Sequence, residues 1–338
     1  MSPLSQRLRI ALLRVVRDSE GPVSSRAVAR AIQQYGFDLS PRTIRQHLGE
    51  LESEGLVTAG SRGRGGGRRI TSAGASEVDD ARVLDRVGLT LAKVDGMCCR
   101  MTFDAESRRG LVVLNVSTVD RRVLPRVFRE MAPVFELGLG MGSRVTLFSP
   151  GDRIGGYRIP SGRIGIGTVC SMSLNGVFLS CRIPVVSRFA GVLELDAFRA
   201  LRFTDVIYYD GTSLDPLQVF IKGGLLSVHS VVQSGCGRIG ASLREIPTCV
   251  LDKARDVISL LSASGLGTAL LVGKPNQPVL GMPVQEGRTG VVVPGGLNPL
   301  AAVEEVGIHT ENRPFSCLFE FARLMDYRDL AAEMDIAL

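Results

Sequence analysis

Apolar residues recur every three or four positions through the first 55 residues, which is the spacing of amphipathic helices. The pattern predicts three helices, whose apolar stripes are Leu8, Leu12 and Val15, then Val28, Ala31 and Ile32, then Ile44, Leu48 and Leu51. Ser24 or Ser25 can cap the second helix, and Ser40 followed by Pro41 begins the third. Because Gly36 ends the second helix shortly before the third begins, we expect a helix-turn-helix.

Residues 56–58 and 69–71 follow as two short strand-like segments on either side of a loop rich in glycine and arginine. The loop contains no acidic residue, and a plain flexible linker needs no arginines. We interpret it as the wing of a winged helix-turn-helix, because such arginines can neutralise phosphates or enter a minor groove. The wing arginines are Arg62, Arg64, Arg68 and Arg69.

Four polar residues of the third helix lie off its apolar stripe, near the end where a recognition helix meets base edges. They are Arg42, Thr43, Arg45 and Gln46. Arginine can bind guanine through two hydrogen bonds, and glutamine can bind adenine. A solvated helix face explains this helix equally well when it is considered alone. The basic wing next to it in the sequence favours a DNA-binding surface.

Charge sets this module apart from the rest of the chain. Residues 1–74 contain twelve arginines and six acidic residues, whereas the whole chain has 40 basic and 34 acidic residues. Residues 75–338 are therefore neutral overall, and the entire net charge of +6 lies on the first module. A polyanion such as double-stranded DNA would bind there. With no Trp and 5% aromatic residues, binding of single strands by stacking is not favoured.

The neutral remainder resembles itself. Residues 111–148 and 238–272 both read strand, helix, strand, and each half is expected to begin with a strand pair, 97–103 with 111–116 and 225–232 with 238–244. Gly162-Arg163-Ile164-Gly165 recurs as Gly287-Arg288-Thr289-Gly290 at an offset of 125 residues. We expect two α+β halves with mixed sheets and pseudo-two-fold symmetry. The cleft between such halves is a usual place for a small ligand.

The chemistry of the side chains excludes several classes of protein. The seven cysteines form no Cys-x-x-Cys pair and there are only three histidines, so no metal site is expected and the thiols are expected to be buried and free. No Ser/His/Asp or His/Cys arrangement suggests catalysis. No apolar run reaches 18 residues and no signal peptide is visible. We expect a cytoplasmic protein that contacts no membrane and needs no cofactor.

The whole chain resembles the NrpR family of archaeal nitrogen-assimilation repressors, and its first module resembles the winged helix found ahead of ribonuclease R. The motifs that carry the resemblance are Leu174-Asn175-Gly176-Val177, Ile183-Pro184-Val185, Ser187-Arg188-Phe189-Ala190-Gly191, residues 210–217, Gly287-Arg288-Thr289-Gly290 and residues 295–299. Membership implies a homodimeric repressor that binds a palindromic operator and leaves it when 2-oxoglutarate binds the regulatory domain. Some members carry two regulatory domains in tandem, whereas this chain has one.

The resemblance, together with the patterning, divides the chain. We expect a winged helix-turn-helix over 1–75, a linker helix over 76–92, an NrpR-like regulatory domain over 93–325 and a C-terminal tail over 326–338. The two repeats of the regulatory domain span about 93–200 and 201–325. The fold class is α+β.

A dicarboxylate effector needs cations and neutral donors, and arginine binds carboxylates through two parallel hydrogen bonds. The candidates are Arg163, Arg188 and Arg288 as cations, and Asn175, Asn298, Thr212 and Ser213 as neutral donors. Each could instead have a structural role, such as an arginine that pairs with a nearby carboxylate.

The sequence thus predicts a ligand-responsive transcriptional repressor rather than an enzyme. Its expected partners are operator DNA, a second copy of the chain, a small anionic effector and the transcription machinery. Two alternatives stay open. The effector could differ from 2-oxoglutarate, or the winged helix could tether an enzyme to nucleic acid.

Overall fold

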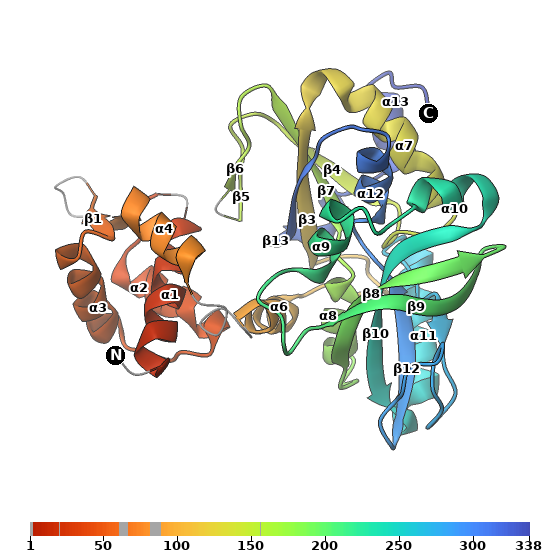
Figure 1. Ribbon diagram of the computed structural model, residues 1–338, viewed down its shortest axis with the longest axis horizontal. Coiled ribbons are helices and arrows are strands. Elements are labelled where there is room, and N and C mark those ends of the chain that lie inside the picture. The colour runs from red at the N-terminus through yellow and green to blue at the C-terminus, as the bar shows by residue number, and fades with distance from the viewer. Residues whose placement is uncertain (1–2, 20, 61–66, 82–88, 156) are drawn as a thin grey trace. The chain divides into compact units, whose positions relative to one another are not determined.

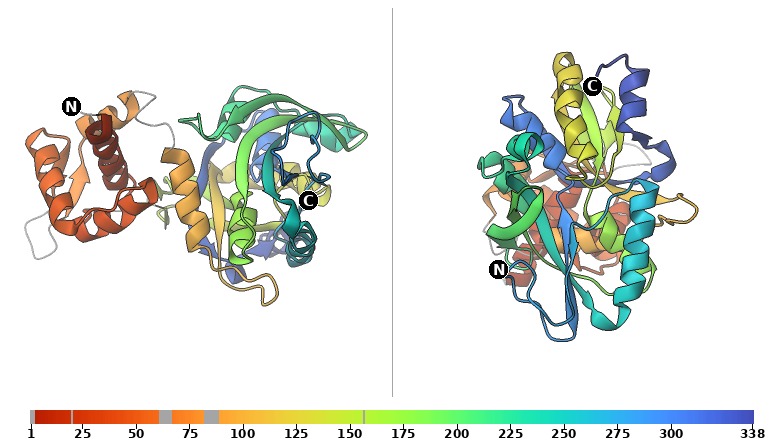
Figure 2. Two further views of the ribbon diagram at one scale, coloured as in Figure 1. Left: turned by 90° about the horizontal axis from the view of Figure 1, so that it is seen from below. Right: turned by 90° about the vertical axis from the view of Figure 1, so that its right-hand side faces the viewer.

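The computed structural model describes residues 3–19, 21–60, 67–81, 89–155 and 157–338 (Figures 1 and 2). The chain divides into two compact units. The first comprises Met1–Gly96 with Asp152–Arg158, and the second comprises Met97–Gly151 with Ile159–Leu338. Among the described residues, no helix is long and apolar enough to cross a membrane.

The first unit contains the three predicted helices and the two wing strands. Its elements are α1 (Pro3–Arg17), α2 (Ser25–Ile32), η1 (Gln33–Tyr35), α3 (Pro41–Ser53), β1 (Val57–Ala59), β2 (Arg68–Ile70), α4 (Ser72–Asp80), the start of α6 (Leu89–Arg100), and the hairpin of β5 (Arg153–Ile154) and β6 (Tyr157–Arg158). Ser24 caps α2 through the N–H of Ala27, and Ser40 caps α3 through the N–H of Thr43. Both predicted caps are confirmed.

The core of this unit is the set of apolar stripes seen in the sequence. Val28 and Ile32 of α2 and Ile44 of α3 are 0% exposed, as is Ile10 of α1. Helix α4 contributes to the same core through Val78, which is buried there. Arg9 of α1 also bonds Glu77 of α4 at 3.0 Å, and Arg17 bonds Asp79 at 3.0 Å. The expected linker helix over 76–92 therefore differs from the structure: α4 ends at Asp80, α6 begins at Leu89, and residues 82–88 lie outside the described residues.

The second unit contains two copies of one element order. The first copy is β3 (Leu111–Asp120), α7 (Leu124–Glu136), β4 (Arg144–Phe148), β7 (Arg163–Val169), α8 (Met172–Ser180) and β8 (Val186–Asp196). The second copy is β10 (Gly237–Pro247), α11 (Leu251–Ser264), β11 (Leu271–Val272), β12 (Arg288–Pro294), α12 (Asn298–Glu305) and β13 (Glu311–Glu320). Between them lie β9 (Arg199–Tyr208), α9 (Pro216–Lys222) and α10 (Val228–Ser234), and after them β14 (Met325–Asp326) and α13 (Tyr327–Glu333).

The two copies exchange a strand. One sheet has the order β11-β12-β10-β8-β9 and the other has the order β13-β3-β7-β4-β14. Strand β8 of the first copy thus pairs with β10 of the second, and β13 of the second copy pairs with β3 of the first. The helices follow the same rule, since α7 packs against α12 and α11 packs against α8. Figure 2 shows α11 beside the strands of its sheet. Neither half can complete its core without the other.

The strand pairings correct the expectation of mixed sheets. Every pairing among the described strands is antiparallel. The parallel pair expected of each strand-helix-strand unit does not form, because β7 lies between β3 and β4, and β12 lies between β10 and β11. The α+β class itself is confirmed.

Two segments expected as strands are helical instead. Residues 97–100 end α6, and residues 228–232 lie in α10. A short apolar run fits a buried strand and a buried helix equally well. In α10 a distant residue decides the outcome, because the Glu305 carboxylate accepts the N–H groups of Val228 and His229, each at 2.8 Å. The sequence around 228 does not reveal this tertiary cap.

Two further expectations need correction. The thiols of Cys98 and Cys170 are buried, but Cys99, Cys236 and Cys249 are exposed, so apolar neighbours in the sequence do not ensure burial. The segment expected as a tail over 326–338 contains α13, whose Tyr327 is 1% exposed and stacks on Phe135 with ring centroids 4.9 Å apart. The C-terminal helix is part of the core of the second unit.

Candidate functional site

Helix α3 presents a polar face opposite its buried stripe. Arg42, Arg45 and Gln46 are exposed, while Ile44 and Leu48 are buried. Within the described part of the chain, Arg42 and Arg45 form no side-chain hydrogen bond or ion pair. Gln46 donates to Glu50 Oε1 at 3.2 Å. The two arginines are therefore available to a partner outside the chain.

Thr43 lies closer to the cap of α3. Its hydroxyl is 2.9 Å from the Ser40 hydroxyl, and its own N–H donates to that oxygen at 3.1 Å. Thr43 thus helps to fix the N-terminus of α3, whose free N–H groups favour an anion.

The two described wing arginines have different surroundings. Arg68 pairs with Glu52 of α3 at 2.7 Å, which links the wing strand to the helix. Arg69 is the next residue on β2 and is exposed, since neighbouring strand residues point to opposite faces. A hydrogen bond of 2.7 Å from Gly60 N to Gly67 O closes the base of the wing. Arg62 and Arg64 lie outside the described residues.

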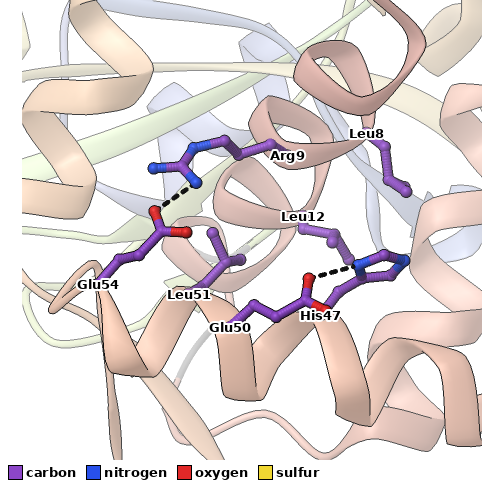
Figure 3. Close-up of a pocket in the computed structure, with 7 residues that line it drawn as sticks. All are labelled: Leu8, Arg9, Leu12, His47, Glu50, Leu51 and Glu54. Atoms are coloured by element: carbon purple, nitrogen blue, oxygen red, sulfur yellow. Dashed lines mark hydrogen bonds and ion pairs between the residues drawn. The ribbon is translucent and has the colours of Figure 1, made fainter. Parts of the chain in front are cut away.

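A hollow of about 290 Å³ lies between α1 and α3, on another side of the recognition helix (Figure 3). Its acidic side chains are Glu50 and Glu54, which pair with His47 and Arg9 respectively. The hydrogen bond from His47 lowers the pKa of Glu50. This side of α3 therefore carries paired acidic side chains, unlike the face that holds Arg42 and Arg45.

The seven effector candidates in the second unit do not converge on one point. Arg163 donates to the hydroxyl of Thr118 at 3.0 Å, and Arg188 lies 3.5 Å from a carboxylate oxygen of Glu245. The NH1 group of Arg288 is buried and has no hydrogen-bond partner among the described residues.

The neutral candidates are similarly dispersed. Asn298 is 0% exposed and is held by the backbone of Gly240 and Leu139. Thr212 closes a local turn through Leu214, and Ser213 is partly buried in the same turn. Of the four neutral candidates, Asn175 alone contacts a charged group that has no counter-ion among the described residues.

That charged group is Arg244, which the sequence analysis missed. It lies on β10, is 0% exposed, and its Nε donates to Asn175 Oδ1 at 2.5 Å. An arginine within an apolar strand has no sequence signal of its own. The repeat offers one clue, because the equivalent position in the first copy is Ser117.

Beside Arg244 lies a small cavity where the two copies meet. Four pairs of equivalent residues line it: Asn115 and Ser242, Cys170 and Gly295, Ser171 and Gly296, Met172 and Leu297. Tyr209 and Asp215 complete its polar lining. Burial raises the pKa of Tyr209 and raises that of Asp215 to about 6. None of the seven effector candidates lines this cavity. Among the described residues, no group of three or more His, Cys, Asp or Glu could hold a metal ion.

Two known protein families match nearly the whole length of this chain. Residues 87–326 match the family of NrpR regulatory domains NRD1 and 2, and residues 10–78 match the ribonuclease R winged-helix domain. The chain belongs to the NrpR family.

Three relatives of the NrpR family are similar in sequence to this chain. The global nitrogen regulator NrpRI of Methanosarcina mazei is 32% identical over 96% of this chain and 99% of its own length. The global nitrogen regulator NrpR of Methanocaldococcus jannaschii is 28% identical over 72% of this chain and 41% of its own. The global nitrogen regulator NrpR of Methanococcus maripaludis is 24% identical over 90% of this chain and 52% of its own length.

A solved structure, that of a nitrogen repressor-like protein from Methanococcus jannaschii, superposes with a TM-score of 0.60 at 27% identity. The match covers 70% of this chain and 97% of the other. The three relatives and the solved structure are named as regulators or as repressor-like, and none of them is named as an enzyme. This NrpR family member is thus a nitrogen-related transcriptional regulator with a winged-helix DNA-binding domain, and the tethered-enzyme alternative is excluded.

Proposed function

We propose that the protein is a homodimeric repressor of nitrogen-assimilation genes that binds a palindromic operator and leaves it when 2-oxoglutarate binds the second unit. The observation that carries the proposal is the exposed pair Arg42 and Arg45 at the capped end of α3, whose side chains form no hydrogen bond or ion pair with the residues that the structure describes. An arginine that binds guanine through two hydrogen bonds distinguishes it from the other bases. The names of the relatives, which are nitrogen regulators, support the choice of target genes.

A second copy of the chain would dock on the hairpin of β8 and β9. Twelve large apolar side chains are exposed in the described part of the chain, and six of them lie between residues 186 and 219. Phe198, Leu201 and Tyr208 belong to this hairpin and its turn, which Figure 1 shows as a long curved strand pair. Exposed apolar clusters of this kind mark interaction surfaces.

The charged side chains of the hairpin can pair with those of a second copy of the same hairpin. Strand β9 is ten residues long and forms an edge of its sheet. It carries Arg199 and Arg202 together with Asp205, so both signs are present on one strand. A two-fold interface places the same patch on both partners and therefore needs a self-complementary surface. A dimer would match the symmetry of a palindromic operator.

The operator test begins with selection of bound sequences from random double-stranded DNA by the full chain. The selected site is then titrated by fluorescence anisotropy with and without 2-oxoglutarate. We expect a palindromic consensus, tight binding to it, and release when 2-oxoglutarate is added. A consensus without two-fold symmetry would contradict the dimeric reading. Operator affinity that ignores 2-oxoglutarate would contradict this choice of effector.

A further inference from the structure

Arg244 is a buried cation that forms no ion pair with the described residues. Its guanidinium donates to Asn175 Oδ1 at 2.5 Å, to Ser242 Oγ at 2.7 Å and to the Ser171 carbonyl at 3.0 Å. All three acceptors are neutral. In the part of the chain that the structure describes, no carboxylate lies within pairing distance of Arg244.

The neighbouring carboxylate does not neutralise it. Glu245 is also 0% exposed, but successive residues of a strand point to opposite faces, and Glu245 pairs with Arg188 at 3.5 Å. Removing a charge from water costs several kcal/mol unless an opposite charge accompanies it. A protein that keeps Arg244 in this position therefore has a site prepared for an anion.

Arg244 lies behind part of the wall of the cavity between the two copies and is not itself a lining residue. Ser171, Met172 and Ser242 line the cavity, and each of them also contacts Arg244. Tyr209 lines it as well, is 5% exposed, and its hydroxyl makes no hydrogen bond with the described residues. A ligand in the cavity would meet up to three hydroxyl groups and the carboxyl group of Asp215, and it would reach the guanidinium of Arg244 once the wall moves aside.

The duplication gives the chain one such site rather than two. Arg163 pairs in register with Asp120, as the equivalent Arg288 does with Pro247. Three residues earlier on each strand are Ser117 and Arg244. Ser117 donates to Asn312 Oδ1 at 2.6 Å, which is a neutral and complete pair. Only the second copy carries the cation.

We propose that Arg244 binds a carboxylate group of a small anionic ligand in this cavity, with Ser171, Ser242 and Tyr209 as additional hydrogen-bond donors. The proposal rests on the function proposed above, because it places the effector that the function requires. Arginine binds a carboxylate through two parallel hydrogen bonds, which a lysine cannot reproduce.

Binding at this site requires the cavity to open. Its volume of about 20 Å³ holds a single water molecule. A carboxylate group is larger, so the lining must move when the ligand enters. Asp215 and Leu217 belong to that lining and begin α9. A ligand that displaces the start of α9 would shift the population of the second unit towards an open form, which is what an effector must do.

The test is calorimetric titration of the full chain with 2-oxoglutarate, glutarate and inorganic phosphate as probes. We expect one ligand per chain for at least one dicarboxylate. Arg244→Gln should lower the affinity about 100-fold, and Arg244→Lys should lower it nearly as much. The milder Tyr209→Phe, which keeps the ring that packs, should lower it about 5- to 10-fold. Arg163→Gln serves as the matched control and should bind like the wild type.

Two readouts separate this proposal from the proposed function. If Arg244→Gln, folded by circular dichroism, and Tyr209→Phe both bind the probes as tightly as the wild type, the site assignment is wrong while effector control survives. If binding depends on Arg244 but operator affinity by anisotropy does not respond to the bound probe, the site stands and effector control fails. Wild-type protein that binds no probe overturns the site assignment. Should Arg244→Gln fail to fold, Tyr209→Phe and Arg244→Lys still decide the question.

Discussion

Arg45 and Arg244 differ in exposure to solvent. Arg45 is exposed on α3 and free of partners in the described residues, whereas Arg244 is 0% exposed beneath α8. Water already stabilises the charge of Arg45, so its role depends on a partner outside the chain. The protein must stabilise Arg244 itself, and it does so with neutral acceptors only. The same residue type thus suits recognition of DNA in one place and of a small anion in the other.

Arg45→Ala should weaken operator binding about 10- to 100-fold and relax base preference at one position, because a bidentate contact contributes about 1–3 kcal/mol of discrimination. Fluorescence anisotropy with the selected operator and with a scrambled duplex measures both effects. Arg255→Ala removes the same charge from the exposed face of α11 and is the control, since among the described residues the Arg255 side chain pairs with Asp252 alone. An equal loss of operator affinity in the two variants would show that net charge, and not a contact from Arg45, determines binding.

Asp215 should make the second unit less stable as the pH rises from 4 to 6. Burial raises its pKa to about 6, above the value near 3.9 of an unfolded chain. The folded state therefore binds more protons in this window, and the free energy of unfolding falls by up to about 3 kcal/mol as the proton is lost. Urea unfolding at pH 4.5 and pH 7 measures the slope.

Asp215→Asn should flatten that slope, because the amide oxygen can still accept the N–H of Gln218 at the start of α9 but cannot ionise. Asp252→Asn is the control, since the Asp252 side chain is 98% exposed. An unchanged slope in Asp215→Asn would mean that another group titrates.

At the scale of elements, the exchange of β8 and β13 brings the two copies into close contact along the cavity. Gly296 lies at this junction. A Cβ atom on Gly296 would lie 2.3 Å from the Val169 carbonyl oxygen and 2.9 Å from Asn115 Nδ2, both of the first copy. The hydroxyl of Thr168 also donates to the Gly296 carbonyl at 3.0 Å. The segment before α12 therefore requires a residue without a side chain.

Gly296→Ala should lower the free energy of unfolding by about 1–3 kcal/mol, because the backbone of β7 cannot move away from an added methyl group at low cost. Thermal melting followed by circular dichroism measures the change. Gly211→Ala is the matched control in the same unit, since nothing lies within 4 Å of the position that its Cβ would take. Equal melting temperatures for Gly296→Ala and the wild type would show that the two copies can separate there.

At the scale of the whole molecule, charge and apolar surface are divided between the two units. The net charge of +6 lies in residues 1–74, whereas the largest concentration of exposed apolar side chains lies between residues 186 and 219. One unit is thus suited to a polyanion and the other to a protein surface. If the hairpin of β8 and β9 joins two chains, the DNA affinity of each winged helix depends on it.

Leu201→Asp should convert the dimer to a monomer, because it places a charge on an apolar residue of β9 that is 51% exposed. Analytical ultracentrifugation at several protein concentrations measures the mass. Leu271→Asp on β11, at the opposite edge of the same sheet, adds the same charge and should leave the dimer intact. A dimeric Leu201→Asp protein would exclude this hairpin as the interface. The monomer should also lose most of its operator affinity, because a palindrome needs two linked winged helices.

The sequence by itself determined the elements whose signals are local. The first three helices were predictable because each has its own apolar stripe, and because Ser24 and Ser40 cap the second and third helices, with Gly36 between them. The DNA surface followed from charge, and the duplication followed from motifs repeated at a constant offset.

Only the tertiary structure decided what depends on contacts between distant residues. The exchange of β8 and β13 and the capping of α10 by Glu305 left no local trace, because the partners are far apart in the chain. The counter-ion status of Arg244 could not be seen either, since a sequence shows that an arginine is present but not what surrounds its guanidinium. Packing removed this one cation from water without a carboxylate, and that placement produced the candidate effector site.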